Sequence, residues 1–362
     1  MASKLRDKKQ VACLHPYIES RRKEIKQGLY PRNHLWGLEG IENEITWRTS
    51  TISSSSVRIP LLVERLLDRS LFRGSPGAKV ELSALRASRS ADLIYSVCGP
   101  LALAKIYAKK LVSWTFREPF HLGSSFKLAH RAYRPRNLSA NAAFFCLTAK
   151  SERSYAKFAP SRFIPWSVDI DLFDGLPPEE KPNKPFFLAT GKTGRDYRSL
   201  VKGSALVNAD VRIIGPSHQK PDRIPPNITW IDTSKDPPDR AIDYPTLRKW
   251  YAQCTAVCIP LFGDSDDTCG YTNMLESMAM RKPVLMTRSG CLHIDPESGG
   301  FGKLIEPQDS QGWTDAMNCI LKDEELANTF GEKGRRMVEK GFTIERFNRD
   351  VLNFLQEVIE TE

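Results

Sequence analysis

The segment DSDDTCGYTNMLESM, residues 264–278, brings acidic, small and apolar residues together in one short run. Asp264 and Asp266 have a spacing that could hold a divalent cation beside a phosphate, and a solvated acidic turn is the alternative. Because Asp-x-Asp is common by chance, we favour the solvated turn and expect no metal.

The residues after this acidic cluster predict a helix with an anion site at its start. The apolar residues of MLESMAM, 274–280, form one face, and the helix should begin near Thr272 or Asn273. The free N–H groups and the dipole of a helix start favour a phosphate. Glu276 follows, and its carboxylate could either cap Asn273 or accept hydrogen bonds from two vicinal hydroxyls, as on a ribose. Residue types alone favour the cap.

A second candidate anion site is TGKTGRDY, residues 190–197. Gly191 lets the backbone approach a ligand, and Lys192 and Arg195 add positive charge before a helix. The spacing is not that of a Walker A loop. A plain strand-to-helix turn with solvated basic residues is the alternative.

Short apolar runs alternate with helical patterns on both sides of these loops, which predicts an α/β fold with parallel sheets. The expected strands are 10–16, 44–50, 91–97, 110–116, 142–149, 186–191, 210–215, 228–232, 256–262 and 282–287. The expected helices include 32–43, 57–72, 195–208, 244–254 and a helical tail. The tail places Phe347, Val351, Phe354, Leu355 and Val358 at helical spacing.

The proline-rich stretch 174–185 predicts a domain boundary. We therefore expect an N-terminal Rossmann-like domain over 1–175, a second over 176–345, and a final helix over 346–362 that could pack toward the first domain. Ligands of such sheets bind at the carboxyl ends of the strands, where both candidate anion sites lie.

Charge separates the two halves of the 362-residue chain, whose net charge is +10. Residues 1–175 carry 29 Lys and Arg against 15 Asp and Glu, and the remainder carries 24 against 28. The basic half is either a solvated surface or one that attracts an anionic acceptor or anionic lipid. We expect no nucleic-acid partner, because no aromatic-and-basic reading motif accompanies the charge.

The segment VRIPLLVERLLDRSLF, residues 57–72, reads as an amphipathic helix, for which core packing is favoured over a membrane-surface role. No apolar run approaches the roughly 20 residues that cross a bilayer, and the N-terminus lacks a signal-peptide core, so we expect a cytoplasmic protein, with peripheral membrane association left open.

The eight cysteines include no CxxC pair. Buried free thiols are favoured over a metal site at Cys254 and Cys258.

From residue 142 onward, the order of these pieces resembles the GT-B retaining glycosyltransferases of glycosyltransferase family four. RFIPWSVDIDLF (162–173), FFLATGKTGRDYRSL (186–200), LRKWYAQCTAVCIPL (247–261) and TCGYTNMLESMAMRKPVLMT (268–287) are similar to that family's segments. The resemblance implies two Rossmann-like doubly wound domains that face a central cleft. It also implies a nucleotide-diphosphate sugar as co-substrate, no cofactor, and a role in glycan biosynthesis.

Residue by residue, the resemblance implies that Lys192 and Arg195 contact the diphosphate and that Glu276 contacts the ribose. The donor-binding set is then Gly191, Thr268, Gly270, Tyr271, Thr272, Asn273 and Glu276, with Lys192, Arg195 and Glu276 as the catalytic set. Thr268 stands where the family has its first glutamate, and Arg281 replaces a glycine. The family's first Gly-rich loop and its acceptor-side histidine are absent, and Arg117, Glu118 and His121 are the nearest candidates on that side.

The activity that the resemblance implies is metal-independent transfer of a sugar, a hexosyltransferase-type reaction with retention, to an unknown acceptor that could be anionic or lipid-linked. Fixed positive charge and N–H groups would stabilise the departing diphosphate. Two alternatives stay open. One is a GT-B nucleotide-sugar epimerase, and the other is a non-catalytic nucleotide-sugar-binding subunit of a larger transferase, which the replacement at Thr268 and the missing histidine favour.

Overall fold

The computed structural model describes residues 8–15, 17–52, 57–73, 75–107, 110–116, 119, 130–174, 182–233, 242–263, 268–289 and 293–360. Arg117, Glu118 and His121, the candidates for the acceptor side, lie outside the described residues, as do Asp264 and Asp266. The chain forms two compact units. Unit 1 comprises residues 1–26, 33–165 and 345–362, and unit 2 comprises residues 27–32 and 166–344.

Unit 1 contains a six-stranded parallel sheet in the order β2-β1-β3-β4-β5-β6. Its strands are β1 (Lys9–Leu14), β2 (Trp47–Ile52), β3 (Leu93–Ser96), β4 (Leu111–Thr115), β5 (Ala143–Cys146) and β6 (Ser161–Phe163). Its α-helices are α1 (Ile18–Lys26), α2 (Leu38–Asn43), α3 (Leu61–Arg69), α4 (Ala78–Ala87), α6 (Pro135–Leu138), α7 (Ala149–Tyr155) and α14 (Ile344–Glu360), and its 3₁₀ turns are η1 (Arg32–Leu35), η3 (Ala104–Tyr107) and η4 (Arg131–Tyr133). β3, β4 and β5 are buried along their whole length, as expected for strands covered on both faces.

The last helix, α14, packs on the sheet of unit 1. Phe347 stacks on Trp114 with ring centroids 5.5 Å apart, and Phe354 meets Phe145 edge to face at 5.1 Å. All five apolar positions that the helical spacing picked out are buried. The apolar stripe of this helix therefore completes the core of unit 1.

Unit 2 contains a second six-stranded parallel sheet, in the order β12-β11-β10-β7-β8-β9. Its strands are β7 (Phe186–Thr190), β8 (Asp210–Gly215), β9 (Ile228–Asp232), β10 (Ala256–Ile259), β11 (Val284–Thr287) and β12 (Gly302–Ile305). Its helices are α8 (Ile170–Phe173), α9 (Tyr197–Ser204), η5 (Ser217–Gln219), α10 (Tyr244–Gln253), α11 (Tyr271–Ala279), α12 (Ser310–Lys322) and α13 (Glu324–Gly341). This is a doubly wound order, in which the direction of winding reverses between β7 and β10.

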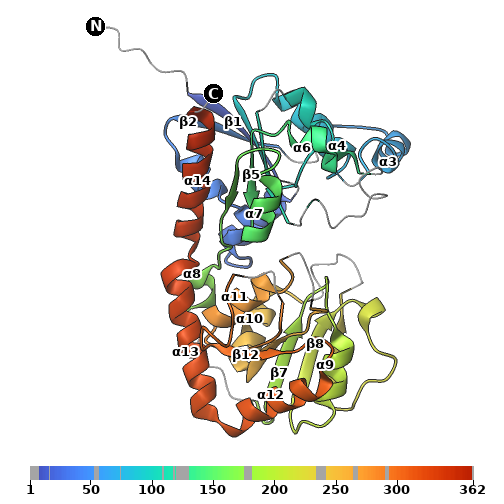
Figure 1. The fold of residues 1–362 in the computed structure, drawn as a ribbon, viewed down its shortest axis with the longest axis vertical. Coiled ribbons are helices and arrows are strands. Elements are labelled where there is room, and N and C mark those ends of the chain that lie inside the picture. The colour runs from blue at the N-terminus through green and yellow to red at the C-terminus, as the bar shows by residue number, and fades with distance from the viewer. Residues whose placement is uncertain are drawn as a thin grey trace. The chain divides into compact units, whose positions relative to one another are not determined.

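Helices cover the sheet of unit 2 on both faces. α9 and α12 lie together on one face (Figure 1), where Tyr197, Leu200, Trp313 and Met317 join the strands in one buried cluster. α11 packs against α13 over the other face. Because helices shield both faces, the open positions for a ligand are the loops at the carboxyl ends of the strands.

The α/β class is confirmed, and some elements differ from the sequence prediction. The helix expected over 32–43 is split into η1 and α2, because Trp36 and Gly37 have φ of 55° and 83°. Helix α1 and strands β6 and β12 were not predicted. No helix in the described parts of the chain is long and apolar enough to span a membrane.

The prediction of buried thiols is confirmed for Cys13, Cys146, Cys254 and Cys258, whereas Cys98, Cys269 and Cys319 are half-buried. Burial raises the pKa of Cys254 to about 11 and keeps its thiol protonated.

Candidate functional site

A pocket of about 180 Å³ lies at the carboxyl ends of β7, β8 and β9 in unit 2. It is lined by Tyr30, Thr190, Gly191, Lys192, Ile214, Thr233, Ile242, Tyr244, Leu247, Thr272, Asn273 and Glu276. Five of the residues that the sequence assigned to a donor site therefore meet here: Gly191, Lys192, Thr272, Asn273 and Glu276. We call this cavity the donor pocket.

Glu276 is the buried acid of the donor pocket, with a side chain that is 3% exposed. The Tyr244 hydroxyl donates to its Oε1 at 3.1 Å, and the Tyr251 hydroxyl donates to its Oε2 at 2.8 Å. Burial raises the pKa of Glu276 to about 7, while the two tyrosine hydrogen bonds act in the opposite direction. Each carboxylate oxygen keeps a further lone pair that could accept a ligand hydroxyl.

The alternative role of Glu276 as a helix cap is wrong. Helix α11 begins at Tyr271, slightly earlier than predicted, and its N-cap is Gly270, at φ 84°. Glu276 is thus the sixth residue of the helix, and its carboxylate is held by the two tyrosines. Its side chain is available to line the pocket because it does not close the helix end.

The first turn of α11 supplies N–H groups to the donor pocket. The Tyr271 N–H donates to the Thr268 carbonyl at 3.1 Å, and the Met274 N–H donates to the Gly270 carbonyl at 2.9 Å. Thr272 and Asn273 lie between them, in the turn whose N–H groups have no preceding helix carbonyl to bond, and both line the pocket. Thr268, Gly270 and Tyr271 lead into the helix and do not line the pocket.

The loop after β7 forms the neighbouring wall. Gly191 has φ 140°, and a Cβ atom there would lie 2.3 Å from Nη2 of Arg195, so a larger residue does not fit. Lys192 is exposed and lines the pocket, while its carbonyl accepts a hydrogen bond from Gln219 Nε2 at 2.9 Å. The lysine ammonium is the positive charge of this wall.

Arg195 stabilises this loop through hydrogen bonds to its backbone and does not line the donor pocket. Its side chain is buried, and its guanidinium donates to the carbonyls of Thr190 and Thr193 at 3.2 Å and 2.9 Å. Nη2 also donates to Oδ1 of Asn273 at 2.7 Å. The structure therefore brings Arg195 into contact with both walls of the pocket rather than with its open space.

The residues of this site that were not predicted include Tyr30, Thr233, Tyr244 and Tyr251. The Tyr30 ring meets the Tyr244 ring edge to face, with centroids 4.8 Å apart. Thr233 follows β9 and is 4% exposed, and its Oγ1 has no hydrogen-bond partner among the described residues. The position of Thr233 directly after a strand was the one signal that the sequence offered for these residues.

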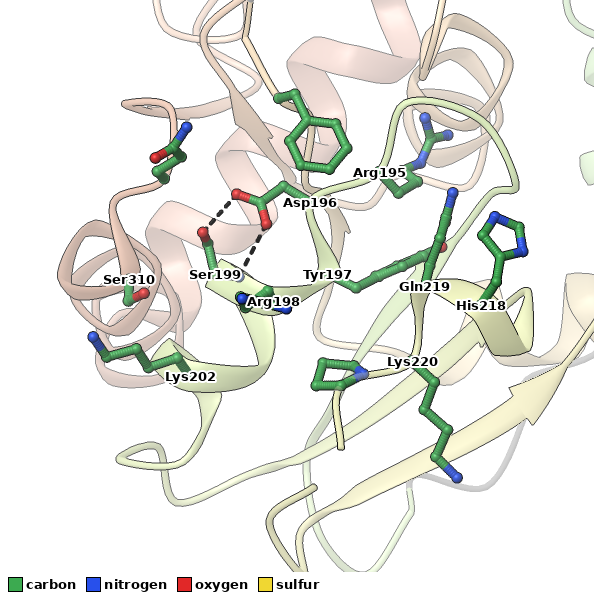
Figure 2. Close-up of a pocket in the computed structure, with 13 residues that line it drawn as sticks. Arg195, Asp196, Tyr197, Arg198, Ser199, Lys202, His218, Gln219, Lys220 and Ser310 are labelled. Atoms are coloured by element: carbon green, nitrogen blue, oxygen red, sulfur yellow. Dashed lines mark hydrogen bonds between the residues drawn. The ribbon is translucent and has the colours of Figure 1, made fainter. Parts of the chain in front are cut away.

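A larger pocket of about 550 Å³ lies beside α9 and shares no lining residue with the donor pocket. Figure 2 shows Lys202, His218 and Lys220 around it, with Asp196 bonded to Ser199 at the start of α9. Arg195 is the one residue of the predicted site that lines it. Because the Asp196 carboxylate already caps α9, this helix start is not an open anion site.

No cluster of three or more His, Cys, Asp or Glu side chains with the geometry of a metal site occurs among the residues that the structure describes. The lining of the donor pocket offers the Lys192 ammonium, the N–H groups at the start of α11 and the Glu276 carboxylate. This set can bind a diphosphate and a pair of hydroxyls.

Comparison with known proteins agrees with this geometry. Residues 199–323 match the family model described as Glycosyl transferases group 1. A curated relative, D-inositol 3-phosphate glycosyltransferase of Corynebacterium jeikeium, is 30% identical over 82 residues. These residues are 23% of this chain and span only 19% of the relative's length.

Solved structures share the fold, and one of them is a glycosyltransferase. The glycosyltransferase from Rickettsia africae has a TM-score of 0.66 and 16% identity, over 98% of this chain and 100% of its own. HepE of Anabaena, solved with UDP and glucose, has a TM-score of 0.63 and 14% identity, over 96% of this chain and 100% of its own. The chain therefore has the GT-B fold, and its residues 199–323 match the glycosyl transferases group 1 model, in agreement with the resemblance seen in its sequence.

Proposed function

We propose that the protein transfers a sugar from a nucleotide-diphosphate sugar to an acceptor, with retention and without a metal. The observation that carries the proposal is the donor pocket, in which Lys192, the first turn of α11 and Glu276 converge. The family match over 199–323 and the fold shared with HepE, which was solved with UDP and with UDP-glucose, support the same reading.

The donor would lie with its diphosphate at the start of α11. The N–H groups of Thr272 and Asn273 and the Lys192 ammonium would then stabilise the charge that grows on the departing diphosphate. These groups are fixed in place before the reaction, and fixed donors contribute most because they need no reorganisation in the transition state. A leaving group stabilised in this way does not require a metal.

The nucleoside would be anchored by Glu276. Two vicinal ribose hydroxyls can donate to its two carboxylate oxygens, and the hydroxyls of Tyr244 and Tyr251 hold the carboxylate in position. Arg195 acts as a positioning residue, since it joins the loop after β7 to Asn273. The acceptor would be anionic or lipid-linked, in keeping with the basic first half of the chain and a peripheral association with a membrane.

Transfer assays with radiolabelled UDP-, GDP-, ADP- and dTDP-sugars test this proposal, with and without EDTA. We expect release of nucleoside diphosphate that EDTA does not affect and that Lys192→Ala lowers at least about tenfold. Lys220→Ala, an exposed lysine of the larger pocket, is the matched control and should retain activity. NMR of the product anomer then tests retention.

A second candidate function is that of a non-catalytic nucleotide-sugar-binding subunit. Thr268 favours it, because the family's first glutamate is missing at that position. Donor binding without hydrolysis or transfer of any of the four nucleotide sugars would support this function over transfer. The epimerase alternative has no specific observation in its favour.

A further inference from the structure

Helix α3 exposes an apolar face in unit 1. Leu61, Leu62 and Leu66 are 58%, 79% and 68% exposed, Val63 is 45% exposed, and no residue of the helix is fully buried. The expectation that this segment packs into the core therefore holds for one side only, because the other side of α3 is exposed. Figure 1 shows the helix at the rim of its unit, beside α4.

The exposed leucines are not needed by the core beneath them. Leu67 and Leu71 of the same segment already face inward, against the buried cluster of Phe72 and Ala78. An amphipathic helix normally turns its whole apolar stripe inward and leaves polar residues outside. In α3 the outward side is apolar as well, which marks it as a surface for a partner.

The basic residues of the segment are exposed, whereas its acidic residues form contacts within unit 1. Arg58, Arg65, Arg69 and Arg73 are all exposed. The two acidic residues are engaged within unit 1. Glu64 pairs with Lys79 at 2.8 Å, and Asp68 Oδ1 accepts the Ala78 N–H at 2.7 Å. The face that remains open combines leucines with arginines that form no ion pair among the residues that the structure describes.

We propose that α3 is a docking surface for an anionic lipid membrane, with Leu62 and Leu66 in the interface and the arginines against lipid phosphates. A helix with apolar residues beside arginine on one face is the kind that lies in the plane of an anionic membrane surface. A purely apolar protein groove would not match the arginines, and a neutral membrane would leave them without a counter-charge. Binding at this surface would bring the protein to a lipid-linked acceptor. In this one respect the inference rests on the proposed function and deepens it.

Vesicle co-sedimentation tests the apolar part of the surface. The full chain is mixed with phosphatidylcholine vesicles that contain or lack phosphatidylglycerol. We expect binding to the anionic vesicles only, and the double variant Leu62→Ser/Leu66→Ser should lose it at least about tenfold. Leu206→Ser is the matched control, because Leu206 is a 73% exposed leucine of unit 2, and it should bind as the native chain does.

The basic part is tested separately with Arg65→Gln/Arg69→Gln. Each arginine near an anionic surface contributes attraction that salt screens, so we expect at least about tenfold weaker binding and a weaker dependence on salt. Arg223→Gln, an exposed arginine of unit 2, is the control that should change neither.

Two outcomes would overturn the inference. One is a vesicle result: either the native chain does not bind anionic vesicles, or the leucine and arginine variants bind them with the affinity of the native chain. The other is that sedimentation velocity shows a dimer that the leucine variant dissociates, which would make a second copy the occupant of this face. Donor titration on the same variants should stay unchanged, so loss of vesicle binding with intact donor binding rejects only this inference.

Discussion

The guanidinium of Arg195 and the side-chain amide of Asn273 are joined by a hydrogen bond of 2.7 Å. This bond links the loop after β7 to the first turn of α11, the two segments that would hold the diphosphate. Arg195 reaches the loop itself through the carbonyls of Thr190 and Thr193. The positive charge at this position thus serves to fix the geometry of the donor pocket.

Arg195→Lys should therefore weaken the site although it keeps the charge. A lysine cannot reproduce the fork that bonds three acceptors at once. We expect a loss of about 2 kcal/mol in the free energy of unfolding, measured by urea denaturation, and at least about tenfold weaker donor binding. The exposed neighbour Arg198 provides the control, Arg198→Lys. If both variants behave alike, the positioning role of Arg195 is wrong.

Gly191→Ala should damage the same loop from the backbone. Its φ of 140° is strained for any other residue, and the added Cβ would displace the Arg195 guanidinium. We expect a loss of about 2 kcal/mol in unfolding free energy together with reduced donor binding. Gly341→Ala is the matched control, because a Cβ there meets no atom within 4 Å, and it should leave both quantities unchanged or slightly improved. Equal stability of the two variants would contradict this packing.

Glu276 should make the stability of the protein depend on pH. Its pKa is raised from 4.5 to about 7 in the folded state, so the folded protein binds more protons than the unfolded chain between these values. Stability should therefore fall as pH rises through this window, by about 3 kcal/mol in all. Glu276→Gln should remove this part of the pH dependence in thermal melts, and the exposed Glu345→Gln should not. A slope that Glu276→Gln leaves intact would place the titrating group elsewhere.

Thr233→Val should raise the stability of the protein while it weakens donor binding. The buried Oγ1 of Thr233 has no partner among the described residues, and an unmade hydrogen bond costs about 1–3 kcal/mol. Valine removes that cost, so the variant should melt at a higher temperature. If the hydroxyl bonds a polar edge of the nucleobase, donor affinity should fall several-fold and the preference among bases should relax. Unchanged affinity for every base would rule out this contact.

The sequence predicted most of the sheet of unit 2 and the two loops that form the donor pocket. The segments near 186–191, 210–215 and 228–232 are short and rich in aromatic and β-branched residues, and β7, β8 and β9 match them closely. β12 is only GKLI, and its glycine is required because a Cβ at Gly302 would collide with the Val284 carbonyl. Such a strand forms because it pairs with the neighbouring strand β11, and its own sequence pattern does not reveal it.

The parts of the site that could not be predicted depend on tertiary contacts. The sequence shows Arg195 as a basic residue at a turn, whereas its burial depends on Asn273. Tyr30 reaches Tyr244 although the two lie far apart in the chain, and no local pattern connects them. Helix α1 buries only Ile18 and Arg21, so its periodicity is too weak to reveal it.

The central claim is that the donor pocket binds a nucleotide sugar through Glu276, and calorimetric titration tests it most directly. UDP-, GDP-, ADP- and dTDP-glucose are titrated into the native chain and into Glu276→Gln at pH about 8, where the native carboxylate is charged. The control is Glu81→Gln, since Glu81 is a buried glutamate of unit 1 that also accepts a tyrosine hydroxyl. We predict that at least one nucleotide sugar binds the native chain and Glu81→Gln alike, and binds Glu276→Gln at least about tenfold more weakly. Equal affinity for the native chain and Glu276→Gln, or no binding to the native chain, would contradict the account.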